Sequence, residues 1–399
     1  MPWSLTKEAV ALGNKILYFS PFDIQRPRTN QLSDMHLCEG FSENGADVRL
    51  VTPKVSRPDN VPKEEINSHY GIHTPFQITY LPTLAKGDVQ GFALMAWINV
   101  LTCILFLGNS FKVKRKQRLI LSRSTAILSP MMFLKKLTPF LPHPPVVLWV
   151  HEISLSRKRL LWLYRNVDLV LTTNSKMKDD LVHKIGIPED KVHVTLNPIS
   201  KAHSKEHMSQ EVAREYIEYE EEKPLIVYTG KLFAGQKEVD FIVRAAQKLP
   251  QYNFLLTGGK PEAVAHYKDW CSQNAVHNIE FTGYMHNYTQ VKYYQAAADV
   301  LVSYYTRSEH IVEYNFPQKI VEYMLTGHPI VSPDFAASRD VLNSENAIFV
   351  EPENTDSLVN GIEVAVEEES SLQKGQKARE FALTCTFDYR TKLILDYLF

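Results

Sequence analysis

Residues 225–258 read LIVYTGKLFAGQKEVDFIVRAAQKLPQYNFLLTG. The apolar run LIVYTG is followed by VDFIVRAAQKL, whose apolar residues recur at helical spacing, and then by a second apolar run, NFLLTG. Continuous apolar runs are typical of strands that helices cover on both faces. A strand, a helix and a strand at this spacing predict two parallel strands joined by a right-handed crossover. The stretch therefore predicts an α/β fold with a parallel sheet.

The same alternation continues in both directions from this stretch. Before it we expect strands at Lys15–Ser20, Asp47–Pro53, Gln77–Tyr80, Leu119–Ser122, Val146–Glu152, Leu169–Ser175 and Val192–Asn197. From it onward we expect strands at Leu225–Gly230, Asn253–Gly258, Ile279–Gly283, Asp299–Tyr304, Pro329–Pro333 and Ala347–Val350.

A polar, charged stretch at Ser200–Lys223 separates the two series of strands, and 399 residues exceed the usual size of one domain. We predict two Rossmann-like domains whose parallel sheets face a central cleft. The N-terminal domain is expected to span 1–200, a linker to follow at 201–222, and the C-terminal domain to span 223–380. A helix at 381–399 is expected to cross the domain junction.

Composition narrows the class of protein. A formal net charge of −1 gives no electrostatic case for a nucleic-acid partner. The four cysteines lie far apart without a CxxC pair, and the first residues, MPWSLTKEAVALGNK, do not resemble a secretory signal. We therefore expect a cytoplasmic protein with reduced thiols. Neither a DxD nor an HExxH motif nor a His/Cys cluster is present, so we expect no metal site.

One apolar segment leaves three interpretations open. Gly91–Phe111 reads GFALMAWINVLTCILFLGNSF and is followed by the basic sequence KVKRKQR. A helix buried between the sheet and the acceptor cleft is favoured, because polar residues interrupt the segment. A surface helix that contacts the inner face of a membrane, and a helix that spans one, are the alternatives.

Two loops carry candidate phosphate ligands. Gly230–Lys237 leads from a strand into a helix, where backbone N–H groups and the ammonium groups of Lys231 and Lys237 would attract an anion. In FPQKIVEYM, Pro317 suits a first helical turn, Lys319 is unfavourable there unless an anion is present, and Glu322 can accept hydrogen bonds from a ribose. Solvated surface lysines and a simple Lys–Glu pair are the ordinary alternatives.

Two residues at strand ends of the first half are further candidates. His151 ends the strand VVLWV and can donate a hydrogen bond to a sugar hydroxyl, although a structural histidine is the competing interpretation. Arg123 can complement a carboxylate or phosphate of the acceptor, or it is a plain surface arginine.

The motifs together resemble a known family. YTGKL, VDFIVRAAQKLP, LLTGG, IEFTGYM, YYQAAADVLVS and FPQKIVEYMLTGHPIV look like the C-terminal half of family-4 glycosyltransferases, which have the GT-B fold. KILYFSPFD, FSENGADVRLVTP, VVLWVHEIS and VDLVLTTNSKMKDDLV match the N-terminal half more weakly. The resemblance implies metal-independent sugar transfer with retention, from a UDP- or GDP-sugar, without a permanently bound cofactor.

The resemblance also implies that 1–200 is the acceptor domain and 223–380 the nucleotide-sugar-binding domain, and it implies site residues. Lys231 and Lys237 would hold the donor diphosphate and act in catalysis, and His151 would approach the transferred sugar. Glu322 would hold the ribose, while Gly283–Met285 would approach the nucleobase, with Gly258 and Gly259 packed closely beside it. The donor-binding set is Gly230, Gly258, Gly283, Tyr284, Met285, Tyr314, Pro317, Lys319 and Glu322.

Three departures from the family pattern affect the prediction. Tyr314 stands where a glutamate is common, and Glu238 stands where a glycine usually follows the second lysine. The usual Gly-Gly turn after the first strand is replaced by a loop with Arg28 and Asn30, which become candidates for acceptor or phosphate contacts.

The acceptor is not identified by the sequence, and a glycan, a lipid-linked molecule or a small molecule are all compatible with it. A nucleotide-sugar 2-epimerase and an inactive subunit that binds sugar nucleotides are the alternative functions.

Overall fold

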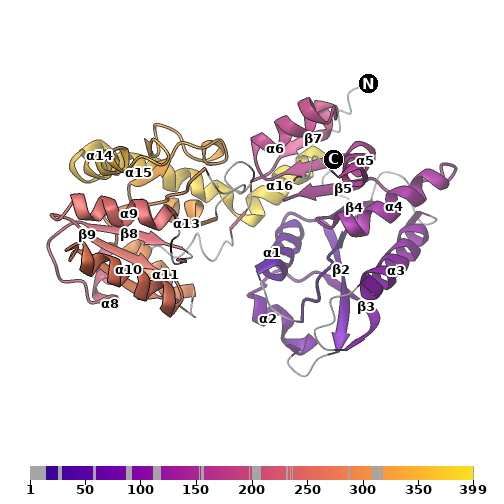
Figure 1. Cartoon of the computed structure of the whole chain (residues 1–399). Helices are drawn as coiled ribbons and strands as arrows, with labels where there is room; N and C mark the ends of the chain where they lie inside the picture. The colour runs from indigo at the N-terminus through magenta and orange to yellow at the C-terminus, as the bar shows by residue number, and fades with distance from the viewer. Residues whose placement is uncertain are drawn as a thin grey trace. The chain divides into compact units, whose positions relative to one another are not determined.

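The computed structural model describes residues 15–25, 29–56, 60–86, 92–110, 118–151, 153, 157–196, 198–199, 208–230, 232–233, 235, 237–285, 288–307, 314 and 318–398. The chain forms two compact units (Figure 1). Unit 1 comprises residues 1–200 and 387–399, and unit 2 comprises residues 201–386.

Unit 1 contains a sheet of seven strands in the order β3-β2-β1-β4-β5-β6-β7, all paired in parallel. The strands are β1 (Lys15–Phe19), β2 (Asp47–Ser56), β3 (Gln77–Lys86), β4 (Arg118–Ser122), β5 (Val146–Val150), β6 (Leu169–Thr172) and β7 (Val192–Val194). The helices are α1 (Thr29–Glu43), α2 (Ile66–Tyr70), α3 (Phe92–Ser110), α4 (Thr125–Leu137), α5 (Lys158–Asn166), α6 (Ser175–Asp179) and α16 (Phe387–Leu398).

Unit 2 contains a parallel sheet of six strands in the order β10-β9-β8-β11-β12-β13. The strands are β8 (Leu225–Thr229), β9 (Asn253–Thr257), β10 (Ile279–Gly283), β11 (Val300–Val302), β12 (Ile330–Pro333) and β13 (Ile348–Val350). The helices are α8 (Gln210–Tyr216), α9 (Lys237–Lys248), α10 (Pro261–Gln273), α11 (Tyr288–Ala296), α13 (Gln318–Thr326), α14 (Thr355–Glu367) and α15 (Glu369–Ala382).

All thirteen strands expected from the sequence are present, and their burial explains why the apolar runs identified them. Every residue of β5 (VVLWV) and of β8 (LIVYT) is buried. Central strands that are buried on both faces gain most from continuous apolar sequence, about 25 cal/mol for each Å² of apolar surface removed from water. The prediction of two parallel-sheet, Rossmann-like domains is confirmed.

Both sheets reverse their strand order at one point. In unit 1 the reversal falls between the adjacent strands β1 and β4, and in unit 2 between β8 and β11. In open parallel sheets, ligands bind beyond the carboxyl ends of the strands at such a reversal. The residues that follow β1 and β4, and those that follow β8 and β11, are therefore the places where a site is expected.

The last helix of the chain belongs to unit 1. The Phe387 N–H donates to the Ile199 carbonyl at 3.0 Å, and the Asn44 side chain donates to the Asp388 carbonyl at 2.7 Å. A Cβ on Gly40 of α1 would lie 2.8 Å from the Thr391 hydroxyl, so a glycine is required where α1 and α16 cross. Within 201–222, which the sequence assigned to a linker, α8 forms and packs against α11 of unit 2.

Helix α3 corresponds to the apolar segment 91–111. One face packs on unit 1, with Ile98, Thr102 and Phe106 fully buried. The other face exposes Trp97 and Ile104, so the favoured interpretation of a buried helix is wrong for that face. No helix within the described ranges is long and apolar enough to cross a membrane.

Candidate functional site

Three glycines meet at the carboxyl ends of β8, β9 and β10 in unit 2. The Gly230 N–H donates to the Thr257 carbonyl at 3.0 Å, and the Gly258 N–H donates to the Gly283 carbonyl at 2.9 Å. Gly258 and Gly283 also form an isolated antiparallel bridge. We call Gly230, Gly258 and Gly283 the glycine rim.

The rim is closed so tightly that a side chain has no room at its centre. A Cβ on Gly258 would lie 1.9 Å from the Gly230 carbonyl oxygen, and Gly258 has φ +120°. A Cβ on the next residue, Gly259, would lie 2.8 Å from the Leu232 Cβ. The rim therefore presents backbone groups where other strand ends present side chains, which suits close approach by a ligand.

The first turn of α13 places a cation beside the end of β8. The Lys319 Nζ lies 4.3 Å from the ring centroid of Tyr228 and 4.3 Å from that of Tyr305. Tyr228 belongs to β8 and Tyr305 follows β11, so the ammonium group lies at the strand-order reversal. A lysine opposes the helix dipole at this end of a helix, but the two ring faces attract its charge by about 0.5–2 kcal/mol.

Glu322, one turn further along α13, is linked to the end of β8. The Gln295 side-chain amide of α11 donates to Glu322 at 3.4 Å and to the Thr229 hydroxyl at 3.1 Å. Thr229 is the last residue of β8 and directly precedes the glycine rim. The carboxylate is therefore held beside the rim by a buried amide.

Tyr323 anchors α13 to the same strand end. The Thr229 N–H donates to the Tyr323 hydroxyl at 2.8 Å, and that hydroxyl donates to the Thr229 carbonyl at 3.3 Å. Burial raises the pKa of Tyr323, so its hydroxyl stays protonated at neutral pH. The orientation of α13, and with it of Lys319 and Glu322, is thus fixed by hydrogen bonds to β8.

The structure brings together five of the residues expected in the donor site, namely Gly230, Gly258, Gly283, Lys319 and Glu322. Of the others, Tyr284 is exposed, and Met285 and Tyr314 are half-buried. Lys231 and Pro317 lie outside the described residues, and Lys237 begins α9 without a described side chain. Glu238, which replaces the usual glycine, is buried in the first turn of α9.

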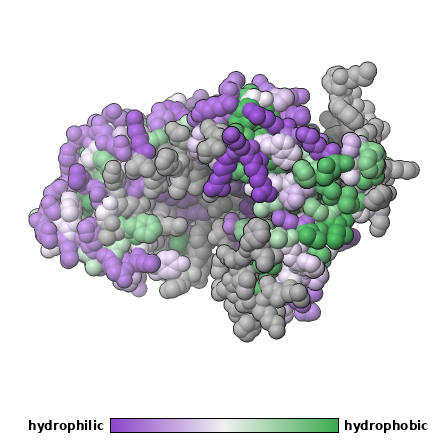
Figure 2. All heavy atoms as spheres, turned by 45° about the vertical axis from the view of Figure 1, so that its right-hand side comes forward, coloured by the Kyte–Doolittle hydropathy of each residue, from purple (hydrophilic) through white to green (hydrophobic). Residues whose placement is uncertain are grey.

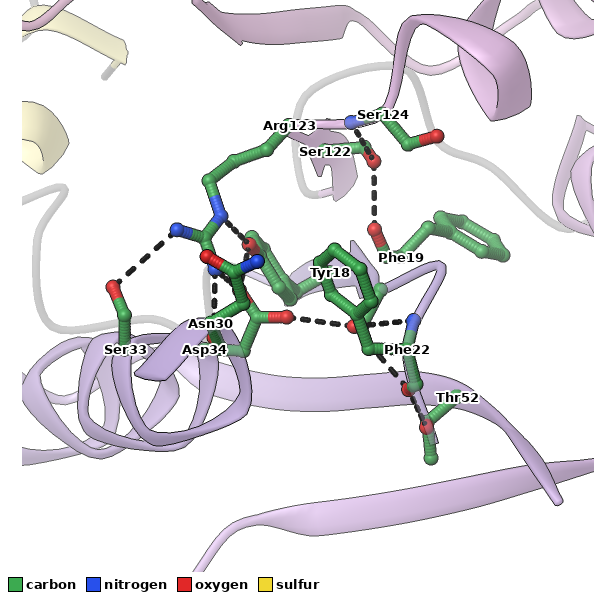
Figure 3. Close-up of polar contacts among 11 residues, drawn as sticks. Tyr18, Phe19, Phe22, Asn30, Ser33, Asp34, Thr52, Ser122, Arg123 and Ser124 are labelled. Atoms are coloured by element: carbon green, nitrogen blue, oxygen red, sulfur yellow. Dashed lines mark hydrogen bonds and ion pairs between the residues drawn. The ribbon is translucent and has the colours of Figure 1, made fainter. Parts of the chain in front are cut away.

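A second polar cluster lies at the reversal of the sheet in unit 1 (Figure 3). Arg123, directly after β4, forms an ion pair with the fully buried Asp34 and donates from Nε to the Tyr18 hydroxyl at 3.0 Å. Its Nη2 also donates to the Asn30 carbonyl at 2.8 Å. Asp34 further accepts from the Tyr18 hydroxyl at 2.5 Å and from the Ser20 hydroxyl at 2.6 Å.

This network keeps Arg123 charged. Burial alone would lower the pKa of Arg123, but Tyr18 and Asp34 outweigh it, and the pKa is raised above its ordinary value. Much of the guanidinium is engaged with groups of its own unit. A contact between Arg123 and an acceptor stays a prediction, as it does for the exposed Asn30, and Arg28 lies outside the described residues.

His151 follows β5 near this cluster and is held neutral. Burial lowers its pKa to about 3, and the positive charge of Arg123 contributes to the shift. The ring lies 4.9 Å from that of Trp149, and its Nε2 is buried without a hydrogen-bond partner among the described residues. A neutral imidazole with an unpaired nitrogen can donate or accept one hydrogen bond, depending on its tautomer.

Several residues of these clusters were not identified from the sequence. Asp34 and Tyr18 are separated from Arg123 by 89 and 105 positions, and only the fold brings them together. Gln295 lies within the stretch YYQAAADVLVS, where no sequence pattern distinguishes it as a site residue. Among the described residues no group of three His, Cys, Asp or Glu side chains could hold a metal ion.

Comparison with known proteins places both units in related families. The family model described as Glycosyltransferase Family 4 matches residues 35–203, and the model described as Glycosyl transferases group 1 matches residues 223–368. The chain is also 27% identical over 201 residues to the uncharacterized glycosyltransferase MJ1607 of Methanocaldococcus jannaschii. That match covers 49% of this chain and spans only half (50%) of the length of the relative.

Solved structures share the fold. A glycosyltransferase from Rickettsia africae superposes with a TM-score of 0.71 at 13% identity, covering 97% of this chain and 98% of the other. HepE (Alr3699) from Anabaena, solved in complex with UDP, gives a TM-score of 0.68 at 15% identity, covering 96% and 98%. These neighbours are glycosyltransferases of the GT-B fold. With one family match in each unit, the chain belongs to the group 1 and family 4 glycosyltransferases.

Proposed function

We propose that this chain transfers a sugar from a UDP- or GDP-sugar to an acceptor, and that unit 2 binds the donor. The observation that carries the proposal is the position of Lys319 and Glu322. Both lie on the first turns of α13, at the reversal of the sheet and linked to the strand end that leads into the glycine rim. The cation suits a diphosphate, the carboxylate suits a ribose, and the glycine backbone allows a nucleotide to approach closely.

The diphosphate would lie at the start of α13, beside Lys319. The N–H groups at a helix N-terminus and the helix dipole attract phosphate oxygens, and an ammonium group adds a full positive charge. The rings of Tyr228 and Tyr305 limit the positions of that ammonium group, so little side-chain freedom is lost when it binds. We propose that Lys231 and Lys237 add further charge, as the family resemblance implies.

The ribose would lie against Glu322. A carboxylate can accept hydrogen bonds from two vicinal hydroxyls, and the Gln295 amide limits its rotation. Gly283 has φ +75°, a Cβ on it would meet no atom of the described residues within 4 Å, and the exposed Tyr284 follows it. We propose that the nucleobase lies along Gly283, Tyr284 and Met285.

The neighbours support this class of donor. HepE of Anabaena has been solved with UDP, with UDP and glucose, and with UDP-glucose. Which base and which sugar this chain uses is the first outcome of the experiment below.

We propose retention of the anomeric configuration and turnover without a divalent ion. Lysines and the N-terminus of α13 would offset the charge that develops on the leaving diphosphate. Turnover in the presence of EDTA tests the metal-independent part of the proposal. Analysis of the product anomer by NMR tests retention.

We further propose that unit 1 contributes His151 to the transferred sugar and provides the acceptor side. Its imidazole is neutral, and the Nε2 has no hydrogen-bond partner among the described residues, so this nitrogen can bind a sugar hydroxyl. A glycan, a lipid-linked molecule and a small molecule remain the acceptor classes to test.

An inactive sugar-nucleotide-binding subunit is the second candidate, favoured by Tyr314 in place of the usual glutamate. It would bind donor without turnover. The 2-epimerase alternative would convert the donor sugar without an acceptor.

A thermal-shift screen against a panel of UDP- and GDP-sugars, followed by assay of released UDP or GDP, separates these functions. A donor that binds the native state raises its melting temperature. We expect one nucleotide class to stabilise the wild type and to stabilise a Lys319→Met variant less. No stabilisation by any nucleotide sugar would refute donor binding, and stabilisation without release would favour the inactive subunit.

A further inference from the structure

Unit 1 exposes a group of large apolar side chains on two neighbouring helices. Helix α3 packs against α4, and the sphere representation shows hydrophobic surface gathered on the side where these helices lie (Figure 2). Ile104 and Phe133 are each 59% exposed, and Phe140 is 79% exposed. We call this surface the α3–α4 face; its members are Trp97, Val100 and Ile104 of α3, Phe133 and Leu137 of α4, and Phe140, which follows α4.

On α3, the exposed apolar side chains of this face lie opposite a side that is packed against unit 1. Trp97, Val100 and Ile104 recur at helical spacing and form one stripe, while Ile98 and Phe106 are buried on the opposite side. The Trp97 indole N–H donates to the Pro82 carbonyl at 2.9 Å, which fixes the ring at the surface. Exposed apolar side chains that gather in one place, held by a rigid support, indicate an interaction surface.

The sequence around this face is strongly basic. Residues 89–151 contain no Asp or Glu and eight Lys or Arg, namely Lys112, Lys114, Arg115, Lys116, Arg118, Arg123, Lys135 and Lys136. Four of these fall in the sequence 111–117, which lies outside the described residues. Lys136 is exposed on α4, beside Leu137.

Further exposed positive charge lies on the next helix. Helix α5 packs against α4, and Arg157, Lys158 and Arg159 at its start are exposed. Helices α3, α4 and α5 contain no acidic residue. Two of the basic residues are engaged elsewhere, Arg123 with Asp34 and Lys135 with Asp168. The rest carry positive charge that no acidic residue on these helices offsets.

We propose that the α3–α4 face binds the surface of a membrane that contains anionic lipids. Apolar side chains on one face of a helix enter the boundary between head groups and acyl chains, and nearby Lys and Arg side chains attract anionic head groups. Tryptophan is favoured at that boundary because its ring is apolar and its N–H is polar.

A second copy of the chain fits this face less well. In a symmetric dimer, each face would meet its own copy, and both would bring the same positive charges to the contact. The charge therefore favours an anionic partner. The proposal does not depend on the proposed sugar transfer, because its residues lie outside the donor-binding set.

Vesicle flotation of the full chain tests the proposal. Vesicles of phosphatidylcholine alone are compared with vesicles of equal parts phosphatidylcholine and phosphatidylglycerol. We expect binding to the anionic vesicles that weakens as salt increases, and a loss of at least about tenfold in affinity for the double variant Ile104→Glu/Phe133→Glu. The matched control is Val212→Glu/Leu372→Glu in unit 2, whose residues are 54% and 58% exposed and should bind like the wild type.

Two further measurements make the result decisive. All four substituted residues are exposed, so melting temperatures should match the wild type and show that a loss of binding is not a loss of folding. Brominated acyl chains should quench tryptophan emission of the wild type, and quench it less in Trp97→Phe.

Failure of the wild type to bind anionic vesicles, or equal loss in the control, would overturn the proposal. Self-association that the Ile104→Glu/Phe133→Glu variant abolishes would assign the face to a second copy instead.

Discussion

Replacing Gly258 by alanine should destabilise unit 2 far more than replacing Gly283, although both glycines have positive φ. A Cβ at position 258 would lie 1.9 Å from the Gly230 carbonyl oxygen, whereas a Cβ at position 283 would meet no atom of the described residues within 4 Å. The obstructing atom at position 258 is backbone, so the ends of β8 and β9 must separate. Separation would strain two hydrogen bonds, from Gly230 to Thr257 at 3.0 Å and from Gly258 to Gly283 at 2.9 Å.

The expected cost follows from these contacts. Two hydrogen bonds at about 1 kcal/mol each, with about 1–3 kcal/mol for a side chain at φ +120°, give about 3–5 kcal/mol for Gly258→Ala. Gly283→Ala carries only the strain of a left-handed alanine, about 1–2 kcal/mol. Urea denaturation of both variants, followed by far-UV circular dichroism, measures the difference. Equal midpoints for the two variants would refute the close approach of β8 and β9.

Two other substitutions test the cluster in unit 1. Asp34→Asn should lower the unfolding free energy by about 3–5 kcal/mol, because it leaves Arg123 without its buried partner. The control Asp334→Asn, in an exposed ion pair, should lower it by less than about 1 kcal/mol. Equal losses in urea denaturation would contradict the burial of Asp34. His151 has a folded pKa of about 3, so below pH 6.5 the unfolded chain binds the proton and stability is lost as pH falls. By pH 5 the wild type should lose about 2 kcal/mol relative to His151→Gln in acid-dependent denaturation, and parallel pH profiles would show that His151 is not held neutral.

The strands could be predicted from the sequence because burial on both faces leaves a local signal. β5 and β8 are continuous apolar runs, and their ends were located to within two residues. The edge strand β3 was harder, since it was expected at Gln77–Tyr80 and extends to Lys86. An edge strand is covered less, and its residues carry a weaker apolar pattern.

The exposure of α3 and the partners of Arg123 could not be predicted in the same way. The composition of an apolar helix predicts that the helix is largely buried, but which face is buried depends on what packs against it. Arg123 was identified as a residue at a strand end, whereas Asp34 comes from the middle of α1. Their contact depends on the order of strands in the sheet, which joins β1 to β4 across 98 intervening residues.

Calorimetric titration of UDP and of GDP into the full chain tests the central claim most directly. We predict that one of the two nucleotides binds the wild type, and that Glu322→Ala and the double variant Lys231→Ala/Lys237→Ala each bind it at least about tenfold more weakly, a difference of about 1.4 kcal/mol. Glu211→Ala, at an exposed glutamate of α8, should bind like the wild type. Unchanged affinity in both Glu322→Ala and the double lysine variant would contradict a nucleoside diphosphate site in unit 2.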